Sequence, residues 1–181
     1  MDLQAYLQNW VDSPMTRITG AAAMVLFVLA MLFKDERKVK GGLALANLLA
    51  VYHLFALGSA VAAAISFAAF IRLGLAWRMR PGSPHARIIA IGFTGFYVVI
   101  WLLLYKTNLD AVALIATLIH TWAVFLFTGV RFRASLALAM GLWVYFDINV
   151  GAMKVAMVSV LCALAALYAW VRELKNQQPR I

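Results

Sequence analysis

The chain has 181 residues, of which 65% are hydrophobic and 13% charged, and its mean hydropathy is +0.88. An average soluble domain carries about 25% charged residues, so the composition excludes a water-soluble globular protein and predicts an integral membrane protein. The net charge of +9 is explained by basic residues beside spanning helices, and we expect no nucleic-acid partner.

The residues ahead of the first long apolar run predict an amphipathic helix at the membrane interface over residues 1–13. Its apolar residues recur at helical spacing, and they are Leu3, Tyr6, Leu7, Trp10 and Val11. The apolar run that follows has no small-residue cleavage motif, so we expect it to be retained as a spanning helix rather than removed as a signal peptide.

Seven stretches of the chain match the roughly 17–25 mostly apolar residues that a spanning helix needs. In chain order they are 16–33, 41–57, 60–77, 87–105, 111–128, 134–150 and 152–171. Gly58 and Gly151 each separate two of these stretches and predict tight turns. The sequence therefore predicts an all-α polytopic membrane protein, a single membrane domain over residues 1–181 with seven transmembrane helices.

Basic residues are distributed unevenly between the two sets of alternating loops. One set, which includes the tail 172–181, holds twelve Lys and Arg, the other set holds three, and Arg72 lies inside a helix. Since Lys and Arg accumulate on the cytoplasmic side, we expect the N-terminus outside and the C-terminus in the cytoplasm. The same basic loops would attract anionic lipid headgroups of the bilayer.

An internal repeat organises the seven stretches. Shifting the chain by 93 residues aligns 38–77 with 131–170 without a gap, with twelve identities in forty positions. Both blocks start at a basic loop, turn at a glycine and end at a tryptophan. Two three-helix units, 16–77 and 111–171, therefore have the same orientation, and the helix over 87–105 is the inversion helix that links them. The predicted arrangement is 3+1+3.

Parallel repeats about an axis along the membrane normal are typical of SWEET-type facilitators, in which the substrate site lies between the halves near the midplane. PnuC-type vitamin transporters share the same plan. This similarity of architecture suggests a solute cavity, although a fold does not fix a function.

Several short motifs, in order along the chain, resemble the YgjV-type family of bacterial inner-membrane proteins. They are Phe33 with Asp35-Glu36-Arg37, His53 with Gly58 and Arg72 downstream, Thr121-Trp122-Ala123 with Phe125, and Trp143-Val144. The resemblance covers nearly the whole chain and implies a multi-pass protein of the bacterial inner membrane, folded as a compact helical bundle. It implies no established activity.

Two positions depart from the pattern that the resemblance implies. Ala69 stands where an Asn is expected three residues before the arginine, and Phe146-Asp147 replaces an expected His-Asn pair. A polar site of the family that uses these positions would therefore be altered in this chain.

Ionisable and polar residues inside spanning segments cost about 2.5–3.5 kcal/mol or more, so each needs a partner, a cavity or a role. His120 lies near the middle of the fifth stretch, where it either lines a cavity or is satisfied by Thr117. His53 is interpreted as a solute ligand or proton-linked switch, or else as a packing histidine bonded to a carbonyl.

Three further side chains are candidates for the solute site. Trp122 and Trp143 lie deeper than an interfacial belt, so they either stack on a flat ligand or pack helices. Asn47 is a candidate as well, although an interhelical hydrogen bond is the commonest use of such a residue. Four tryptophans fit interfacial positions instead, and they are Trp10, Trp77, Trp101 and Trp170.

Charged residues predict gating groups or ion pairs. Arg72 either snorkels to the headgroups at the cytoplasmic end or attracts an anion to a vestibule. Asp147 and Lys154 flank the Gly151 turn, so they form either a structural pair near the outer interface or an entrance for an ion or proton.

Catalytic motifs are absent from the sequence. It has no Ser-His-Asp spacing, phosphate loop or His-Glu-x-x-His pattern, and we expect no enzyme. The single Cys162 excludes an intramolecular disulfide and a cysteine metal site. Without a Cys-x-x-Cys-His motif the histidines do not favour haem, so no metal or cofactor is expected.

The sequence favours a small transporter or facilitator of a polar metabolite, with His120, Trp122 and Trp143 around a midplane cavity and His53 or Asn47 nearby. The alternative is a non-transporting membrane scaffold or partner subunit, in which the same polar residues only lock helices together. The oligomeric state stays open. A cavity beside these residues would favour transport, and tight packing without a void would favour the scaffold.

Overall fold

The computed structural model of the chain describes residues 14–105 and 107–177, and the predicted interfacial segment 1–13 lies outside them. The described chain forms seven α-helices. They are α2 (Pro14–Leu32), α3 (Glu36–Ala56), α4 (Ala60–Arg78), α5 (Pro84–Leu104), α6 (Asn108–Leu126), α7 (Gly129–Asn149) and α8 (Met153–Gln177).

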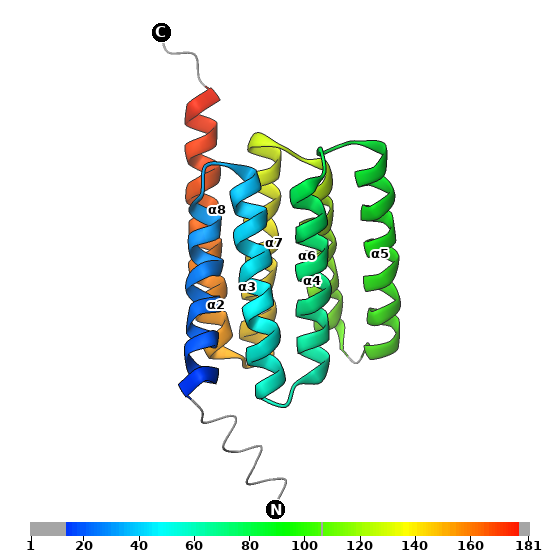
Figure 1. Cartoon of the computed structure of the whole chain (residues 1–181), viewed down its shortest axis with the longest axis vertical. Coiled ribbons are helices and arrows are strands. Elements are labelled where there is room, and N and C mark those ends of the chain that lie inside the picture. The colour runs from blue at the N-terminus through cyan, green and yellow to red at the C-terminus, as the bar shows by residue number, and fades with distance from the viewer. Residues whose placement is uncertain (1–13, 106, 178–181) are drawn as a thin grey trace, which may run out of the picture.

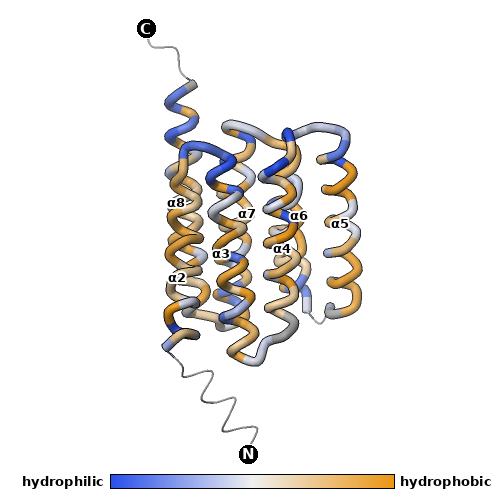
Figure 2. Tube along the Cα trace, viewed as in Figure 1, coloured by the Kyte–Doolittle hydropathy of each residue, from blue (hydrophilic) through white to orange (hydrophobic). Residues whose placement is uncertain are grey.

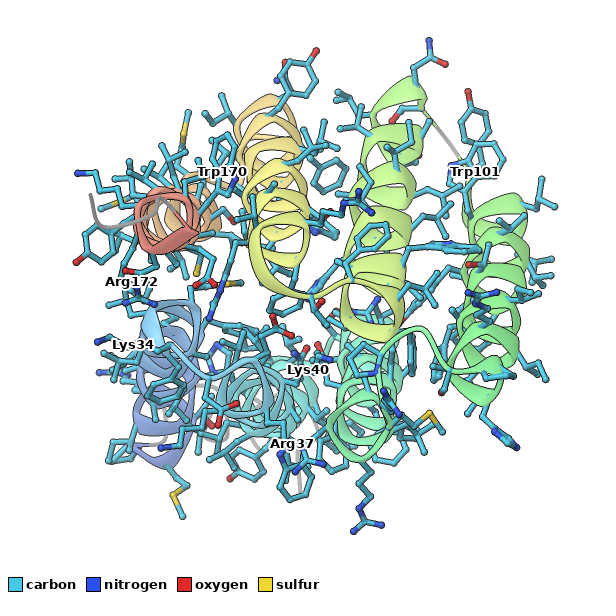
Figure 3. All side chains as sticks on the ribbon, turned by 90° about the horizontal axis from the view of Figure 1, so that it is seen from above. Lys34, Arg37, Lys40, Trp101, Trp170 and Arg172 are labelled. Atoms are coloured by element: carbon cyan, nitrogen blue, oxygen red, sulfur yellow. The ribbon has the colours of Figure 1, made fainter. Side chains whose placement is uncertain are left out.

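The helices stand side by side in two layers (Figures 1 and 3). One layer contains α2, α3 and α4, and the other contains α8, α7, α6 and α5. Neighbours in the chain pack together as α2–α3–α4 and as α6–α7–α8, while α2 contacts α8 and α4 contacts α6 across the layers. Helix α5 packs mainly against α6, so it lies outside the ring that the other six helices make.

The seven predicted helices are confirmed, and most boundaries agree within three residues. The differences are largest at the end of α8, six residues beyond the apolar stretch, and at the starts of α3 and α7, five residues before it, because these helices continue through charged residues at the membrane surface. Asp35 caps α3 by accepting a hydrogen bond from the backbone N–H of Arg37 at 2.7 Å. Gly58 and Gly151 occupy the predicted turns with φ values of 78° and 76°, a region that favours glycine.

Five described helices are long and apolar enough to span a membrane, namely α2, α3, α5, α6 and α8. Helix α7 has the same length as α3 but carries Arg131, Arg133 and Asp147. Figure 2 shows apolar residues along the middle of the bundle and polar ones towards its ends. The chain is therefore a multi-pass membrane protein.

Many of the fully buried side chains are small, and many large apolar side chains are exposed on the outside of the bundle. Ala30, Ala46, Ala86 and Ala123 are fully buried, which lets neighbouring backbones approach closely. By contrast Leu103 is 77% exposed. This distribution fits a bundle surrounded by lipid, where small buried residues allow the helices to pack closely.

One end of the bundle, called the basic end here, carries Lys34, Arg37, Arg78, Arg80 and Arg131 in the loops and first or last helical turns. The opposite end carries the turns at Gly58 and Gly151. Helices α4 and α6 run towards the basic end, and α5 runs away from it (Figure 1).

Two arginines of the second layer cap the end of α2 at the basic end. Arg133 of α7 donates to the carbonyls of Phe33 at 2.6 Å, Lys34 at 2.9 Å and Met31 at 3.3 Å. Arg172 of α8, labelled in Figure 3, donates to the same turn. The last carbonyls of a helix have no donor within it, so these guanidinium groups supply the N–H donors that the end of α2 lacks.

Candidate functional site

The side chain of Arg72 lies inside the bundle. It is 3% exposed, and its Nη1 donates to the hydroxyl of Thr121 at 2.6 Å and to the carbonyl of Thr117 at 3.4 Å. The prediction that Arg72 snorkels to the basic end is wrong. Because α4 runs towards that end and helical side chains tilt towards the helix N-terminus, the guanidinium points back to the middle of the membrane and finds acceptors on α6.

His120 of α6 lies beside this guanidinium, 9% exposed, with its Nδ1 3.5 Å from Nη2 of Arg72. Arginine can only donate, so Nδ1 is the acceptor and the proton of the neutral ring sits on Nε2. Thr117 does not satisfy His120, because Nε2 of His120 has no partner among the described residues, and the Thr117 hydroxyl donates to the carbonyl of Ala113 at 2.9 Å.

Tyr97 of α5 completes what we call the Arg72 cluster, which contains Arg72, Tyr97, Thr117, His120 and Thr121. The Tyr97 ring centre lies 5.4 Å from the Cζ atom of Arg72, and the residue is 5% exposed. Tyr97 was not predicted from the sequence, because a tyrosine within an apolar stretch is ordinarily interpreted as a residue that packs against neighbouring helices. Its place in the middle of a spanning helix, away from the interfacial belt, was the available signal.

Three polar atoms of the cluster are buried without a hydrogen-bond partner among the described residues. They are Nε of Arg72, the hydroxyl of Tyr97 and Nε2 of His120. Buried polar groups in proteins are almost always paired, so three unpaired polar atoms in one place make the cluster a candidate binding site.

No carboxylate neutralises Arg72 within the described part of the chain, since its polar neighbours are Thr117, Thr121, His120 and Tyr97. The described carboxylates with assigned partners bond elsewhere in the bundle. Asp35 caps α3, Glu36 accepts from the N–H of Gly129, Asp110 caps α6 and Asp147 accepts from Ser159. The cluster therefore carries an uncompensated positive charge inside the bundle.

A pocket of about 180 Å³ adjoins the cluster between α4, α5, α6 and α7. It extends from Tyr97 and Thr117 to Asp110, which lies in the first turn of α6 at the end opposite the basic end. The remaining lining residues are Ile65, Ile100, Trp101, Ala113, Leu114 and Trp143. Tyr97 is shared, because it lines the pocket and stacks on Arg72.

The structure brings together three of the residues singled out in the sequence. Arg72 and His120 lie in the cluster, and Trp143 lines the pocket. Trp122 neither belongs to the cluster nor lines the pocket. Its Nε1 donates to the hydroxyl of Thr94 at 3.0 Å and so links α6 to α5.

His53 and Asn47 lie apart from the cluster. The Nδ1 atom of His53 is 2.9 Å from the carbonyl of Thr16, and a side-chain atom added at Gly20 would lie 2.5 Å from the same ring. His53 therefore packs α3 on α2. Asn47 donates to the carbonyl of Leu43 in its own helix at 2.8 Å, in place of the expected interhelical bond.

Asp147 lies near the Gly151 turn, buried, and its carboxylate accepts a hydrogen bond from Ser159 of α8. The side chain of Lys154 lies outside the described residues, so the predicted Asp147–Lys154 pair stays a prediction.

A second, larger cavity of about 580 Å³ lies at the basic end, lined by both basic and acidic residues, among them Asp35, Glu36, Arg37, Lys40 and Arg80. Lys40 is buried there, with its Nζ atom 5.5 Å from the ring centre of Phe132. In the described ranges no group of three His, Cys, Asp or Glu residues is placed to hold a metal ion.

Comparison with known proteins gives one finding. A family model described as Imp-YgjV, bacterial inner membrane protein, matches residues 15–177. No curated protein and no solved structure matches the chain.

Proposed function

The chain belongs to the Imp-YgjV family of bacterial inner membrane proteins, and from this premise we propose that it is a small transporter or facilitator of a polar metabolite. The observation that carries the proposal is the pocket between α4, α5, α6 and α7 next to the Arg72 cluster, whose positive charge has no carboxylate neighbour among the described residues. A cavity that joins apolar walls to convergent polar groups is the usual form of a small-molecule site.

We propose the 3+1+3 arrangement of seven spans as the framework for this site. The helix bounds support it, because adding 93 to Glu36–Ala56 gives 129–149, the bounds of α7, and adding 93 to the start of α4 gives the start of α8. The contacts support it too, since α2 with α8 and α4 with α6 are the two pairs that a twofold axis along the bundle would relate. Helix α5 is then the inversion helix.

The repeat offers an internal comparison for the Arg72 cluster. The same shift relates Arg72 to Ala165, His120 to Phe27 and Thr121 to Val28. Of these counterparts, Ala165 belongs to the buried apolar core, and Phe27 and Val28 are partly buried and pack against it. The fold thus packs the corresponding place with apolar side chains, so packing at this position does not require a guanidinium. This contrast favours a solute site over a scaffold, in which polar residues would serve packing alone.

In this proposal, transport results from movement of the two three-helix units around the Arg72 cluster. The pocket leads from the cluster towards the end opposite the basic loops, which the positive-inside rule assigns to the outside. Rocking the two three-helix units against each other would expose the cluster to the other side, by analogy with the SWEET-type and PnuC-type architectures.

Uptake into liposomes tests the proposal. The purified protein is reconstituted and offered labelled carboxylates, amino acids and nucleosides, and at least one should accumulate in a protein-dependent way. Because Trp143 lines the pocket, Trp143→Ala should lower that uptake about tenfold by removing an aromatic contact. Trp77→Ala is the control, since Trp77 is 46% exposed near the basic end. Absence of protein-dependent uptake across the panel would favour the scaffold.

The sidedness has its own test. Single cysteines are introduced into a Cys162→Ala background at Asn108, exposed at the opposite end, and at Arg80, exposed at the basic end. In spheroplasts a membrane-impermeant maleimide should label Asn108→Cys at once and Arg80→Cys only after permeabilisation. The reverse pattern would contradict the proposed orientation.

A further inference from the structure

We infer that the solute of this site is a small organic monocarboxylate, bound by the Nε–Nη2 edge of Arg72 with its apolar body in the pocket between α4, α5, α6 and α7. This inference rests on the proposed solute site, and it adds the chemical class of the ligand. Four observations carry it: the free edge of the guanidinium, the neighbouring donors, the single charge and the lining of the pocket.

The guanidinium of Arg72 presents one edge that is not used by the protein. Nη1 is committed to Thr121 and Thr117, whereas Nε has no partner among the described residues and Nη2 has only the 3.5 Å contact with His120. Parallel N–H donors on one edge of arginine match the two oxygens of a carboxylate. The ring of Tyr97 covers the face of the guanidinium and leaves that edge available.

Two more donors lie around this edge. The hydroxyl of Tyr97 and Nε2–H of His120 are buried and unpaired in the described part of the molecule, and both side chains contact Arg72. Each can donate to a carboxylate oxygen. A carboxylate would therefore satisfy three donors that otherwise stay buried without an acceptor, which is the costly condition that folded proteins avoid.

The charge of the site selects a monoanion. Arg72 is the one cationic side chain in the cluster as described, and none of its neighbours there is acidic. One carboxylate neutralises it, whereas a dianion such as phosphate would carry an excess negative charge into the membrane interior, which is unfavourable.

The pocket provides the place for an apolar body. Ile65, Ile100, Leu114, Trp101 and Trp143 line it, and its one carboxylate is engaged at the far end, where Asp110 accepts from the backbone N–H of Thr107 at 2.7 Å. Apolar and aromatic walls with a few polar groups at one end orient an amphipathic solute with its charge at that end.

Tyr97 controls passage between the pocket and Arg72. It belongs to α5, which packs mainly against α6, and its side chain both contacts the guanidinium and lines the pocket. Rotation of this one side chain, with a small shift of α5, would join the pocket to the free edge of Arg72.

Matched probes of different charge test the inference on the purified full-length protein in detergent. Benzoate and butyrate carry a carboxylate, and benzamide and butyramide have the same bodies without the charge. We expect at least one carboxylate to raise the unfolding temperature and bind measurably by calorimetry, while both amides have no effect. Binding of the amides as strongly as of the acids, or no effect of either acid, would overturn the inference.

Variants of Arg72 sharpen the result. Arg72→Met should abolish the response to the carboxylate, and Arg72→Lys should weaken binding about tenfold or more, because lysine keeps the charge but lacks the paired donors. Arg78→Met, at an exposed position of the same helix, is the control and should bind as the unaltered protein does. An undiminished response in Arg72→Met, shown to be folded by circular dichroism, would contradict the assignment.

Liposome uptake of the same probes separates this inference from the proposed function. Binding of a carboxylate without uptake would support the monocarboxylate site and overturn transport. Uptake of an amide without binding of its acid would support transport and overturn the monocarboxylate site.

Discussion

Replacing Arg133 with alanine is expected to lower the free energy of unfolding by about 3–5 kcal/mol. Arg133 is 2% exposed and donates to three carbonyls at the end of α2. Hydrogen bonds from a charged group contribute about 1.5–3 kcal/mol each, and truncation leaves buried acceptors unpaired. Titration with SDS from a mild detergent, followed by circular dichroism, measures the change.

Arg131→Ala is the matched control for this prediction. Arg131 lies two residues earlier in α7 and is exposed, so its truncation should change the unfolding free energy by no more than about 0.5 kcal/mol. Arg133→Lys should fall between the two variants, since one ammonium group cannot reach three carbonyls in the way a guanidinium fork does. Equal stability of Arg131→Ala and Arg133→Ala would remove the capping role of Arg133.

In contrast to Arg133→Ala, Arg72→Met is not expected to destabilise the protein. In the absence of solute it should leave the unfolding free energy unchanged or raise it by about 1–4 kcal/mol. The substitution removes a cation that is buried without a carboxylate neighbour among the described residues, and a side chain of similar length fills the space. A gain in stability together with a loss of carboxylate binding is typical of a residue retained for function.

The scaffold alternative predicts a loss of stability in the same experiment. In that case the bonds from Arg72 to Thr117 and Thr121 hold α4 on α6, and Arg72→Met should destabilise the bundle. Leu73→Ala calibrates the assay, because Leu73 is fully buried in the core and its truncation should cost about 2–5 kcal/mol. A loss for Arg72→Met comparable with that for Leu73→Ala would favour the scaffold.

The seven helices follow from the sequence because the length of an apolar stretch in a membrane protein is set by the thickness of the bilayer. The starts of α3 and α7 were harder to predict from the sequence. The apolar stretch begins only after the charged residues, whereas each helix already begins before them, at Glu36 and Gly129. The turns at Gly58 and Gly151 were predictable because glycine interrupts the apolar run at the length of one span.

The candidate site was predictable only in part. Depth along a helix can be read from the sequence, and it singled out His120, which contacts Arg72, and Trp143, which lines the pocket; their role in binding stays a prediction. Rotation about the helix axis cannot be read when a helix is apolar on all sides, so the partners of Tyr97 and Trp122 were not available. The side chain of Arg72 points away from the basic end because helical side chains tilt towards the N-terminus of their helix, here α4. Hydropathy gives no information on this tilt.

The capping of α2 has a consequence for the order in which the protein is made. The carbonyls of Phe33 and Lys34 leave the ribosome about a hundred residues before Arg133, and those of Leu32 and Phe33 about 140 residues before Arg172. Helix α2 therefore enters the bilayer before its last carbonyls have their arginine donors, and water and headgroups must solvate these carbonyls during translation. Its mature contacts form when α7 and α8 arrive, so assembly of the bundle is completed by its last helices rather than its first.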